Sequence, residues 1–464
     1  MFTKSRSVDN YLLGGIALIF LAYIPRLWDP SVFPKFVVAT LLACSLLPLT
    51  LKTLRASIAV DNTIKSLVVA TGLLLIIGFI STLVSDDHFT ALFGLASRYN
   101  GFIGFHIALS FIFIGRAVGS KDLTRRFLWL LSLTALFESI IGLAQKNGYV
   151  LIVAKNLYSP IIGTFGNPNF FSAFLGFGSI STLYLIFASK TIVIRFSLLL
   201  NLSLCLLVMY WSESIQGLFM FALGSIILIT KVIQSGAKKS YLIIWASFII
   251  FSTYFVVIGL LNRGPLKVFL FQESTFYRFD YWRAAIRMIK THLLLGVGPD
   301  QYQYSYITYR DAKSVARETN VVTDSAHNMY LQLGATYGTI YLVSFLLIIL
   351  LLSWIALKAI PRTMLGTLDY EESALSALWL AFVLQASISV DTISALVPGF
   401  LSGGLLIAKE SIDKTLGQAR AKRESLKIAK VKFKYVTLST LIGIATLLPM
   451  GNQLGFVQVH RPQQ

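Results

Sequence analysis

The chain has 464 residues, of which 56% are hydrophobic and 13% charged, and its formal net charge is +19 at pH 7. This composition excludes an ordinary soluble domain, in which about 25% of the residues are charged. The two cysteines, Cys44 and Cys205, lie in different apolar stretches, which argues against a disulfide framework or a cysteine-based metal site. We therefore expect an integral membrane protein.

Apolar runs recur along the chain, and each is bounded by charged residues or by Gly and Pro. A helix that crosses the hydrocarbon core needs about 20 mainly apolar residues. The runs predict an all-α, polytopic helical bundle of about 12–13 membrane-spanning helices in a single membrane domain, residues 1–464. The expected spans are 11–28, 33–51, 66–84, 101–118, 127–145, 170–188, 196–211, 217–233, 241–262, 328–357, 373–390, 393–408 and 435–455.

The positive charges predict the orientation, because cytoplasmic loops retain an excess of Lys and Arg. With the N-terminus in the cytoplasm, 25 of the 40 Lys and Arg residues fall on the cytoplasmic side, and thirteen spans then place the C-terminus outside. The basic charge is thus explained by topology and by contact with anionic membrane lipids, without nucleic acid as a partner.

The basic cytoplasmic loop 409–434 carries nine of these positive charges. Such a loop can recruit a cytoplasmic partner, but a solvated or lipid-facing loop is the simpler interpretation.

The outer segment 263–326 is too long for a simple connection, and long ordered loops are usually functional. It is rich in aromatic side chains, which are scarce in disordered chains. These rings suit sugar stacking as well as anchoring at the membrane interface, and both interpretations stay open. The aromatic residues are Phe276, Tyr277, Tyr281, Trp282, Tyr302, Tyr304, Tyr306 and Tyr309.

Within this loop, residues 279–290 predict a short amphipathic helix along the membrane surface. One stripe is apolar, and a neighbouring stripe contains Arg283 and Arg287, which can hold a lipid pyrophosphate or simply contact phospholipid headgroups. For these two arginines, taken individually, headgroup contact is the simpler interpretation. Arg278 projects from the far side of the apolar stripe and needs a separate explanation.

Several short motifs occur in a fixed order between residues 163 and 338. Their sequences are Gly163-Thr164-Phe165-Gly166-Asn167-Pro168-Asn169, Ser212-x-Ser214-x-x-Gly217, Arg278-x3-Trp282-x2-Ala285, His292-Leu293-Leu294-Leu295-Gly296-Val297-Gly298-Pro299 and Ala326-His327-Asn328-x-Tyr330-Leu331-Gln332-Leu333, followed by Gly334 and Gly338. Each motif alone is common, but the ordered set resembles the O-antigen ligase and O-antigen polymerase superfamily.

This resemblance implies a metal-independent glycosyltransferase, without a cofactor, in a bacterial cytoplasmic membrane. Its donor would be a glycan on undecaprenyl pyrophosphate, and its acceptor an unidentified lipid, protein or glycan. The catalytic histidine of the family falls on His327, and its outer-loop arginine falls on Arg278. Many ligases also carry an Arg within the Ser-x-Ser motif, where this chain has Ile215 and Gln216.

Other candidate contacts follow from the same motifs. Arg98, in a stretch that resembles a family loop, is a candidate donor contact, as are Asn167, Asn169 and Gln216. Trp282 and Asn328 join Arg283 and Arg287 as candidate headgroup or sugar contacts. Asn169 and the residues before it predict an N-cap whose helix could bind an anion, although a purely structural turn fits the same residues.

The chemistry can also be argued from the residues themselves. Transfer of a sugar from pyrophosphate to a hydroxyl requires stabilisation of the leaving group and usually a base. His327 suits that base, since it would begin a long apolar helix, 328–357, at the outer interface. Glu138 and His106 lie inside expected spans, where ionisable residues are usually functional.

Three functions remain in view: ligation of a finished glycan, polymerisation of repeat units, and transport of a lipid-linked glycan by a flippase. Transporters usually show internal repeats and charged residues at the midplane. In this sequence the polar motifs gather at the outer boundary, which favours an enzyme.

Overall fold

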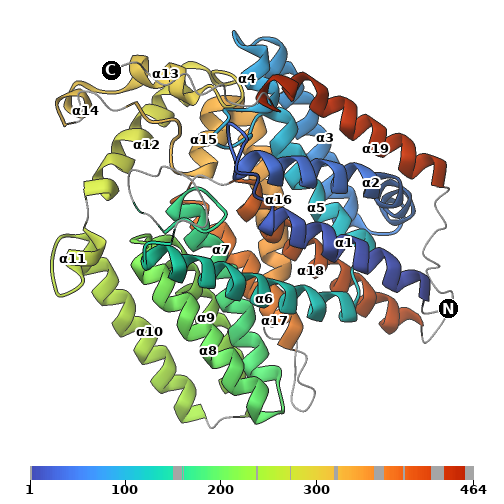
Figure 1. The fold of residues 1–464 in the computed structure, drawn as a ribbon, viewed down its shortest axis with the longest axis vertical. Coiled ribbons are helices and arrows are strands. Elements are labelled where there is room, and N and C mark those ends of the chain that lie inside the picture. Colours follow the sequence, from blue (N-terminus) through green and yellow to red (C-terminus); the bar gives the residue numbers. More distant parts are fainter. Residues whose placement is uncertain are drawn as a thin grey trace. The chain divides into compact units, whose positions relative to one another are not determined.

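The computed structural model describes residues 3–149, 159, 161–236, 239–271, 273–317, 322–359, 370–389, 392–419 and 433–454. Over these residues the chain is helical, with no strand (Figure 1). The helical bundle predicted from the apolar runs is confirmed. The chain forms two compact units, of which the first is made of Met1–Ser66, Leu95–Phe221 and Asp391–Gln464, and the second of Leu67–Gly94 and Ala222–Val390.

The first unit is built from helices at both ends of the chain. They are α1 (Thr3–Leu21), α2 (Val32–Ile58), α5 (Phe102–Val118), α6 (Lys121–Lys146), α7 (Pro168–Ala188), α8 (Ile192–Trp211), the start of α9 (Ile215–Gly236), α18 (Ile393–Ala419), α19 (Phe433–Leu447) and the 3-10 helix η1 (Leu448–Leu454). Figure 1 shows the dark red α19 beside the blue α2, so the two ends of the chain pack together.

Small residues allow α5 and α18 of this unit to approach closely. A Cβ atom on Gly404 would lie 2.2 Å from the carbonyl oxygen of Ile112, and one on Gly115 would lie 2.9 Å from that of Leu401. Small residues at such crossings are typical of helix packing in membranes. Either glycine could be replaced only if the two backbones moved apart.

The second unit contains segment 263–326, which is predicted to face outward, and the helices on either side of it. They are α3 (Asn62–Leu83), α4 (His88–Phe93), the rest of α9, α10 (Lys239–Leu260), α11 (Lys267–Leu270), α12 (Glu273–Thr291), α13 (Tyr302–Tyr309), α14 (Ala312–Arg317), α15 (Met329–Tyr337), α16 (Thr339–Ala359) and α17 (Tyr370–Gln385). Helix α12 encloses residues 279–290, which confirms the short helix predicted there, whereas its position along the membrane surface stays a prediction.

The predicted single helix over 328–357 is wrong, because the chain breaks at Gly338 between α15 and α16. Gly338 has φ +89°, a conformation that L side chains rarely adopt, and a Cβ there would lie 2.2 Å from the carbonyl oxygen of Leu294. The N–H of Thr339 donates to the carbonyl of Leu293 at 2.7 Å. The break therefore accommodates the turn that follows α12.

Eight helices among the described residues are long and apolar enough to cross a membrane, and three more are apolar but shorter. The protein is therefore a multi-pass membrane protein. The eight are α2, α3, α6, α7, α8, α9, α10 and α16, and the shorter ones are α5 and parts of α18 and α19. The predicted span 11–28 extends too far, since α1 ends at Leu21.

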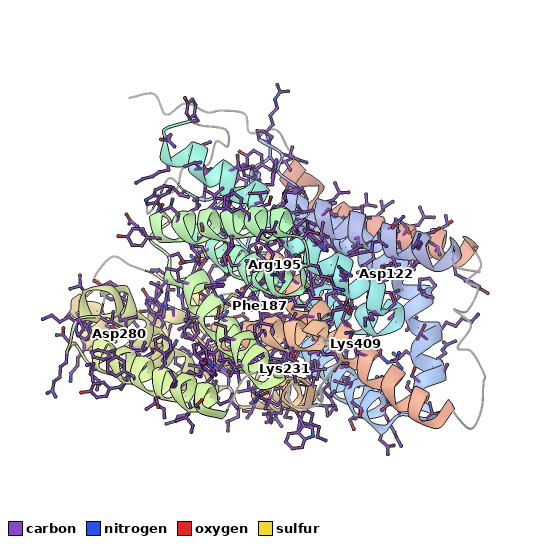
Figure 2. The ribbon with its side chains drawn as sticks, turned by 90° about the horizontal axis from the view of Figure 1, so that it is seen from below. Asp122, Phe187, Arg195, Lys231, Asp280 and Lys409 are labelled. Atoms are coloured by element: carbon purple, nitrogen blue, oxygen red, sulfur yellow. The ribbon has the colours of Figure 1, made fainter. Side chains whose placement is uncertain are left out.

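Few charged side chains are buried within these helices. Figure 2 labels two of them, Lys231 of α9 and Lys409 of α18, which are 2% and 7% exposed. Part of the predicted basic loop 409–434 belongs to α18, and its residues 420–432 lie outside the described residues, as does the C-terminus. Its interpretation as a cytoplasmic loop stays a prediction.

Candidate functional site

Helix α12 carries a buried face distinct from its apolar stripe. Tyr281, Ala284, Ala285 and Met288 recur at helical spacing and are at most 7% exposed. They form one hydrophobic core with residues of α13, the loop before α15, and α15 itself. By contrast, Phe279 of the predicted apolar stripe is 47% exposed. The outward stripe fits contact with the membrane, whereas the buried face fixes α12 against the rest of the outer segment.

Arg278 lies one helical turn before Tyr281 on the same side of α12, because residues three apart are neighbours on a helix. Its side chain is half-buried. Burial lowers the pKa of its guanidinium, and the nearby Tyr281 opposes that shift. Within the described ranges, no hydrogen bond or ion pair engages this guanidinium. Arg278 therefore offers a partly desolvated cation that has no carboxylate partner there.

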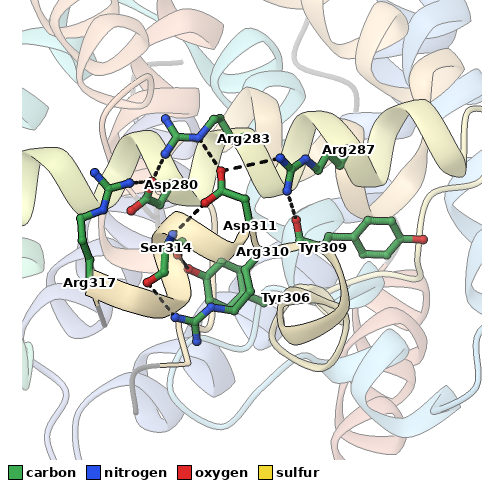
Figure 3. A network of polar contacts seen from close by, with 9 residues as sticks. All are labelled: Asp280, Arg283, Arg287, Tyr306, Tyr309, Arg310, Asp311, Ser314 and Arg317. Carbon is green, nitrogen blue, oxygen red and sulfur yellow. Dashed lines mark hydrogen bonds and ion pairs between the residues drawn. The ribbon is translucent and has the colours of Figure 1, made fainter. Parts of the chain in front are cut away.

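Arg283 and Arg287, by contrast, belong to an ion-pair network on the exposed side of α12 (Figure 3). Arg283 donates to Asp280 and, at 3.0 Å, to Asp311, while Arg287 lies 3.6 Å from Asp311. Arg317 of α14 also donates to Asp280, at 2.6 Å. The network holds α14 against α12. It also engages Arg283 and Arg287, for which contact with lipid headgroups was the simpler prediction.

The carboxylate of Asp311 is stabilised in its charged form. The N–H of Ser314 donates to it at 2.7 Å, and this bond, followed by Arg283, lowers the pKa of Asp311. Asp311 also caps the start of α14 through that bond. One carboxylate therefore orders α14 and orients two arginines of α12.

His327 lies in the loop before α15 and is half-buried. Its φ angle is 48°, which is uncommon for a residue other than glycine and costs free energy unless the surroundings hold it. Hydrogen bonds on both sides do so. The N–H of Ala326 donates to Oε1 of Gln332 at 2.8 Å, and that of Met329 donates to the carbonyl of Ala386 at 2.8 Å.

Asn328 completes this arrangement as the N-cap of α15, because its Oδ1 accepts from the N–H of Leu331 at 3.0 Å. Its oxygen therefore has a structural role. Gln332 has a comparable one, which the sequence analysis missed. Gln332 belongs to the same motif as His327, two residues after Tyr330, and this position was the signal that could have identified its role.

The imidazole of His327 contacts a ring from α12. The ring centroids of His327 and Tyr281 lie 5.6 Å apart with planes inclined by 30°. Because Tyr281 is also the helical neighbour of Arg278, the second unit brings the predicted base and the predicted donor contact around one buried tyrosine. From sequence alone, Tyr281 is only one of the aromatic residues of segment 263–326.

Trp282 is half-buried, and its ring meets that of Phe279 edge-on, with centroids 5.2 Å apart. Its indole N–H is shielded from solvent and has no acceptor among the residues described. A ligand oxygen could satisfy this donor, so Trp282 remains a candidate contact.

In the first unit, two of the predicted motifs meet. Asn169 accepts a hydrogen bond from Oγ of Ser214 at 2.8 Å. Ser172, one turn later on α7, donates to the carbonyl of Ser214 and accepts from the N–H of Gly217, both at 3.0 Å. Gln216, at the start of α9, is 1% exposed beside them. The structure thus joins the segments that carry Asn167, Asn169 and Gln216.

The predicted N-cap lies at Asn167, within the run of residues that ends at Asn169. Asn167 caps α7, because its Oδ1 accepts from the N–H of Asn169 at 2.8 Å. Pro168 then occupies the first helical position, where its missing N–H costs nothing. Arg98, also in the first unit, is 2% exposed and precedes Tyr99, whose φ is 54°.

A buried polar network holds the turn before α7. The Lys35 ammonium donates to Oγ1 of Thr164 at 3.0 Å and to the carbonyl of Phe20 at 2.6 Å. Glu138 accepts from the Thr164 hydroxyl at 2.7 Å and from its N–H at 3.0 Å. Lys35 and Glu138 are both 0% exposed. The signal for this network was a lysine inside a predicted span.

The described residues contain no group of three or more His, Cys, Asp or Glu side chains that could hold a metal ion. The second unit offers the guanidinium of Arg278, the imidazole of His327 and the indole N–H of Trp282. A guanidinium binds phosphate oxygens, and an imidazole accepts a proton near neutral pH.

One comparison with known proteins covers the part of the chain that contains Arg278, Trp282 and His327. A family model described as O-antigen ligase matches residues 171–346. That region contains α12, Arg278 and His327, and the match confirms the resemblance to the O-antigen ligase and polymerase superfamily. No curated protein matches the chain.

Proposed function

We propose that this multi-pass membrane protein, whose residues 171–346 match the O-antigen ligase family, is an O-antigen ligase-like glycosyltransferase. It moves a glycan from an undecaprenyl-pyrophosphate carrier to a hydroxyl or amide of an acceptor at the outer face of the cytoplasmic membrane. The observation that carries the proposal is the placement of Arg278 and His327 around Tyr281. The guanidinium of Arg278 has no carboxylate partner in the described part of the second unit.

In the proposed reaction, the acceptor oxygen forms a bond to the anomeric carbon of the glycan while the bond from that carbon to the pyrophosphate oxygen breaks. The acceptor proton passes to the imidazole of His327, and undecaprenyl pyrophosphate leaves with the bonding electron pair. Arg278 stabilises the charge that develops on the leaving group. Because His327 has a fixed backbone, its imidazole needs little reorganisation to meet the acceptor.

For the first unit, we propose that Arg98, Asn167, Asn169 and Gln216 bind donor phosphate or sugar groups. Asn169 supports this, since its oxygen accepts from Ser214 and its side-chain N–H groups have no acceptor among the described residues. The reaction as proposed requires no metal. A purified preparation should therefore keep its turnover in the presence of a chelator, and loss of turnover would contradict this part of the proposal.

The decisive test of the proposed base is replacement of His327. His327→Ala should lower the rate of the chemical step roughly 10²–10⁴-fold, which is the usual size of general-base catalysis. Asn can hydrogen-bond a hydroxyl but cannot take its proton at neutral pH. His327→Asn should therefore resemble His327→Ala if proton transfer is the role, and should keep substantial activity if orientation is the whole role.

The matched control is His292, which is exposed in the same unit and bonds the hydroxyl of Tyr309 at 2.8 Å. His292→Ala should leave turnover within about threefold of the unmodified protein, because His292 is not the proposed base. Loss of a general base would lower the rate far more than that. The assay uses purified protein and a lipid-pyrophosphate glycan, with single turnovers at excess enzyme. Near-normal turnover of His327→Ala would reject a catalytic role for this residue.

Deletion of the gene distinguishes ligation from polymerisation. A strain that accumulates full-length polymer on the lipid carrier has lost a ligase, which is the expected result. A strain that accumulates single repeat units on the carrier has lost a polymerase, and this outcome would contradict ligation.

A further inference from the structure

Tyr281 is held more firmly than an aromatic residue that only anchors a loop at the membrane. Its side chain is 7% exposed. The hydroxyl of Tyr302 donates to its backbone carbonyl at 2.6 Å, and the ring of Tyr306 meets its ring edge-on at 5.7 Å and 79°. The backbone and the ring of Tyr281 are therefore both fixed by α13.

Of the two groups that the proposed reaction requires, one contacts this fixed residue and the other is its neighbour on α12. The imidazole of His327 packs on the ring of Tyr281 at 5.6 Å. Arg278 is three residues before Tyr281 on α12, so the two side chains project from the same side of the helix.

We propose that Tyr281 is a positioning residue for glycan transfer, whose ring orients the imidazole of His327 relative to the guanidinium of Arg278. This inference rests on the function proposed above. A base must lie within hydrogen-bond reach of the proton it takes, and a misplacement of about 1 Å can cost 10²-fold in rate. A buried ring that is itself anchored on two sides supplies that restraint.

The proposal separates the ring of Tyr281 from its hydroxyl. Tyr281→Phe keeps the ring that contacts His327 and should keep kcat within about threefold. Tyr281→Leu removes the ring and should lower kcat roughly 10–100-fold, since misplacement of the base acts on the chemical step. The KM for the donor should change less than kcat. Where the Leu variant does not accumulate, Tyr281→Met, which stays apolar and contacts aromatic rings, gives the same comparison.

A double-mutant cycle with His327→Ala tests whether Tyr281 acts through His327. Residues that act as a unit are strongly non-additive, whereas independent effects multiply. Tyr281→Leu should therefore cost little further rate once His327 is Ala. The control is Tyr341→Leu, which removes a fully buried ring of α16 outside the core around Tyr281. It should lower the melting temperature, and its effect on rate should be the same in both backgrounds.

Two results would overturn the inference while leaving the proposed function intact. One is an equal rate loss from Tyr281→Leu in the presence and absence of His327, as for Tyr341→Leu, because this indicates a structural role alone. The other is normal kcat in Tyr281→Leu alongside an inactive His327→Ala. Near-normal activity of His327→Ala would instead reject the proposed base, and the positioning role with it.

Discussion

The three arginines of α12 show how much a single side chain's surroundings decide. Arg283 and Arg287 share the carboxylate of Asp311, whereas the half-buried Arg278 has no such partner in the described ranges. A salt bridge between exposed groups contributes little to stability, but it does occupy the cation. A pyrophosphate must compete with Asp311 for the first two arginines and with no described carboxylate for Arg278.

Replacement of the arginines should therefore separate their roles. Arg278→Ala should raise the KM for a pyrophosphate-linked donor about 10-fold or more, because a charge-assisted hydrogen bond contributes roughly 1.5–3 kcal/mol. Arg283→Ala is the matched control on the same helix and should change that KM less than about threefold. Initial rates at varied donor concentration measure both. Equal, mild effects from the two variants would contradict the assignment of Arg278 to the donor.

At this scale the sequence predicted identities better than contacts. The position of Arg278 apart from the basic stripe follows from helical geometry, and His327 follows from the motif it belongs to. The role of Gln332 depends on a bond to a backbone N–H six residues earlier across a turn, and the partner of Tyr281 comes from a distant segment. The local sequence does not show that these groups meet in the fold, so neither contact was predicted.

At the scale of helices, the apolar runs predicted most elements, because burial in lipid or in other helices requires long apolar segments. The exceptions have local causes. The apolar run 328–357 continues through Gly338, and only the fold shows the backbone of Leu294 against that glycine. Asp29 accepts from the N–H groups of Val32 and Phe33 at the start of α2. Residues 22–28, which the predicted span 11–28 included, therefore belong to the connection between α1 and α2.

Glu138 illustrates an ionisable residue whose burial has a structural explanation. Its place inside a predicted span indicated a functional residue, but its two carboxylate oxygens accept from Thr164, whose hydroxyl also accepts from Lys35. The network joins α2 and α6 to the turn that begins with Gly163. It therefore holds in place the loop that leads to Asn167 and α7.

Breaking this network on one side should be worse than removing it. Glu138→Gln leaves the Lys35 ammonium buried without its counter-charge, and an unpaired buried charge typically costs about 3–5 kcal/mol. The melting temperature in detergent should fall by several degrees or more. The double variant Lys35→Met with Glu138→Leu removes both charges and should recover part of that loss. Equal melting temperatures for Glu138→Gln and the unmodified protein would show that the pair does not stabilise the fold.

For the molecule as a whole, hydropathy and charge predict two separate properties, the helices and their orientation in the membrane. Hydropathy sets the number and length of the helices, whereas the distribution of Lys and Arg predicts which ends face the cytoplasm. The net charge of +19 is consistent with the predicted basic cytoplasmic loops, and nine further positive charges lie in segment 263–326, which is predicted to face outward. In that segment the ion pairs of Asp280 and Asp311 engage Arg283, Arg287 and Arg317, which the sequence pattern alone could not show.

The predicted orientation places the proposed chemistry on the outer face, and it can be measured without an activity assay. A reporter fused after Gly417 should lie in the cytoplasm, because the segment around it is rich in Lys and Arg, which cytoplasmic loops retain. A reporter fused after Gln464 should lie outside, because one further predicted span, 435–455, separates the two positions. A phosphatase that folds only outside the membrane and a fluorescent protein that matures only inside give opposite signals at each site.

Each fusion is its own control, since a site that is active with one reporter should be silent with the other. The positive-inside rule weighs short loops near the helix ends most strongly, so neutralising the lysines and arginines of 409–434 should weaken the cytoplasmic signal after Gly417. Detection of both sites on the same side of the membrane would contradict the thirteen-span count. A cytoplasmic signal from a reporter inserted in 263–326 would place Arg278 and His327 on the cytoplasmic face and would contradict transfer at the outer face.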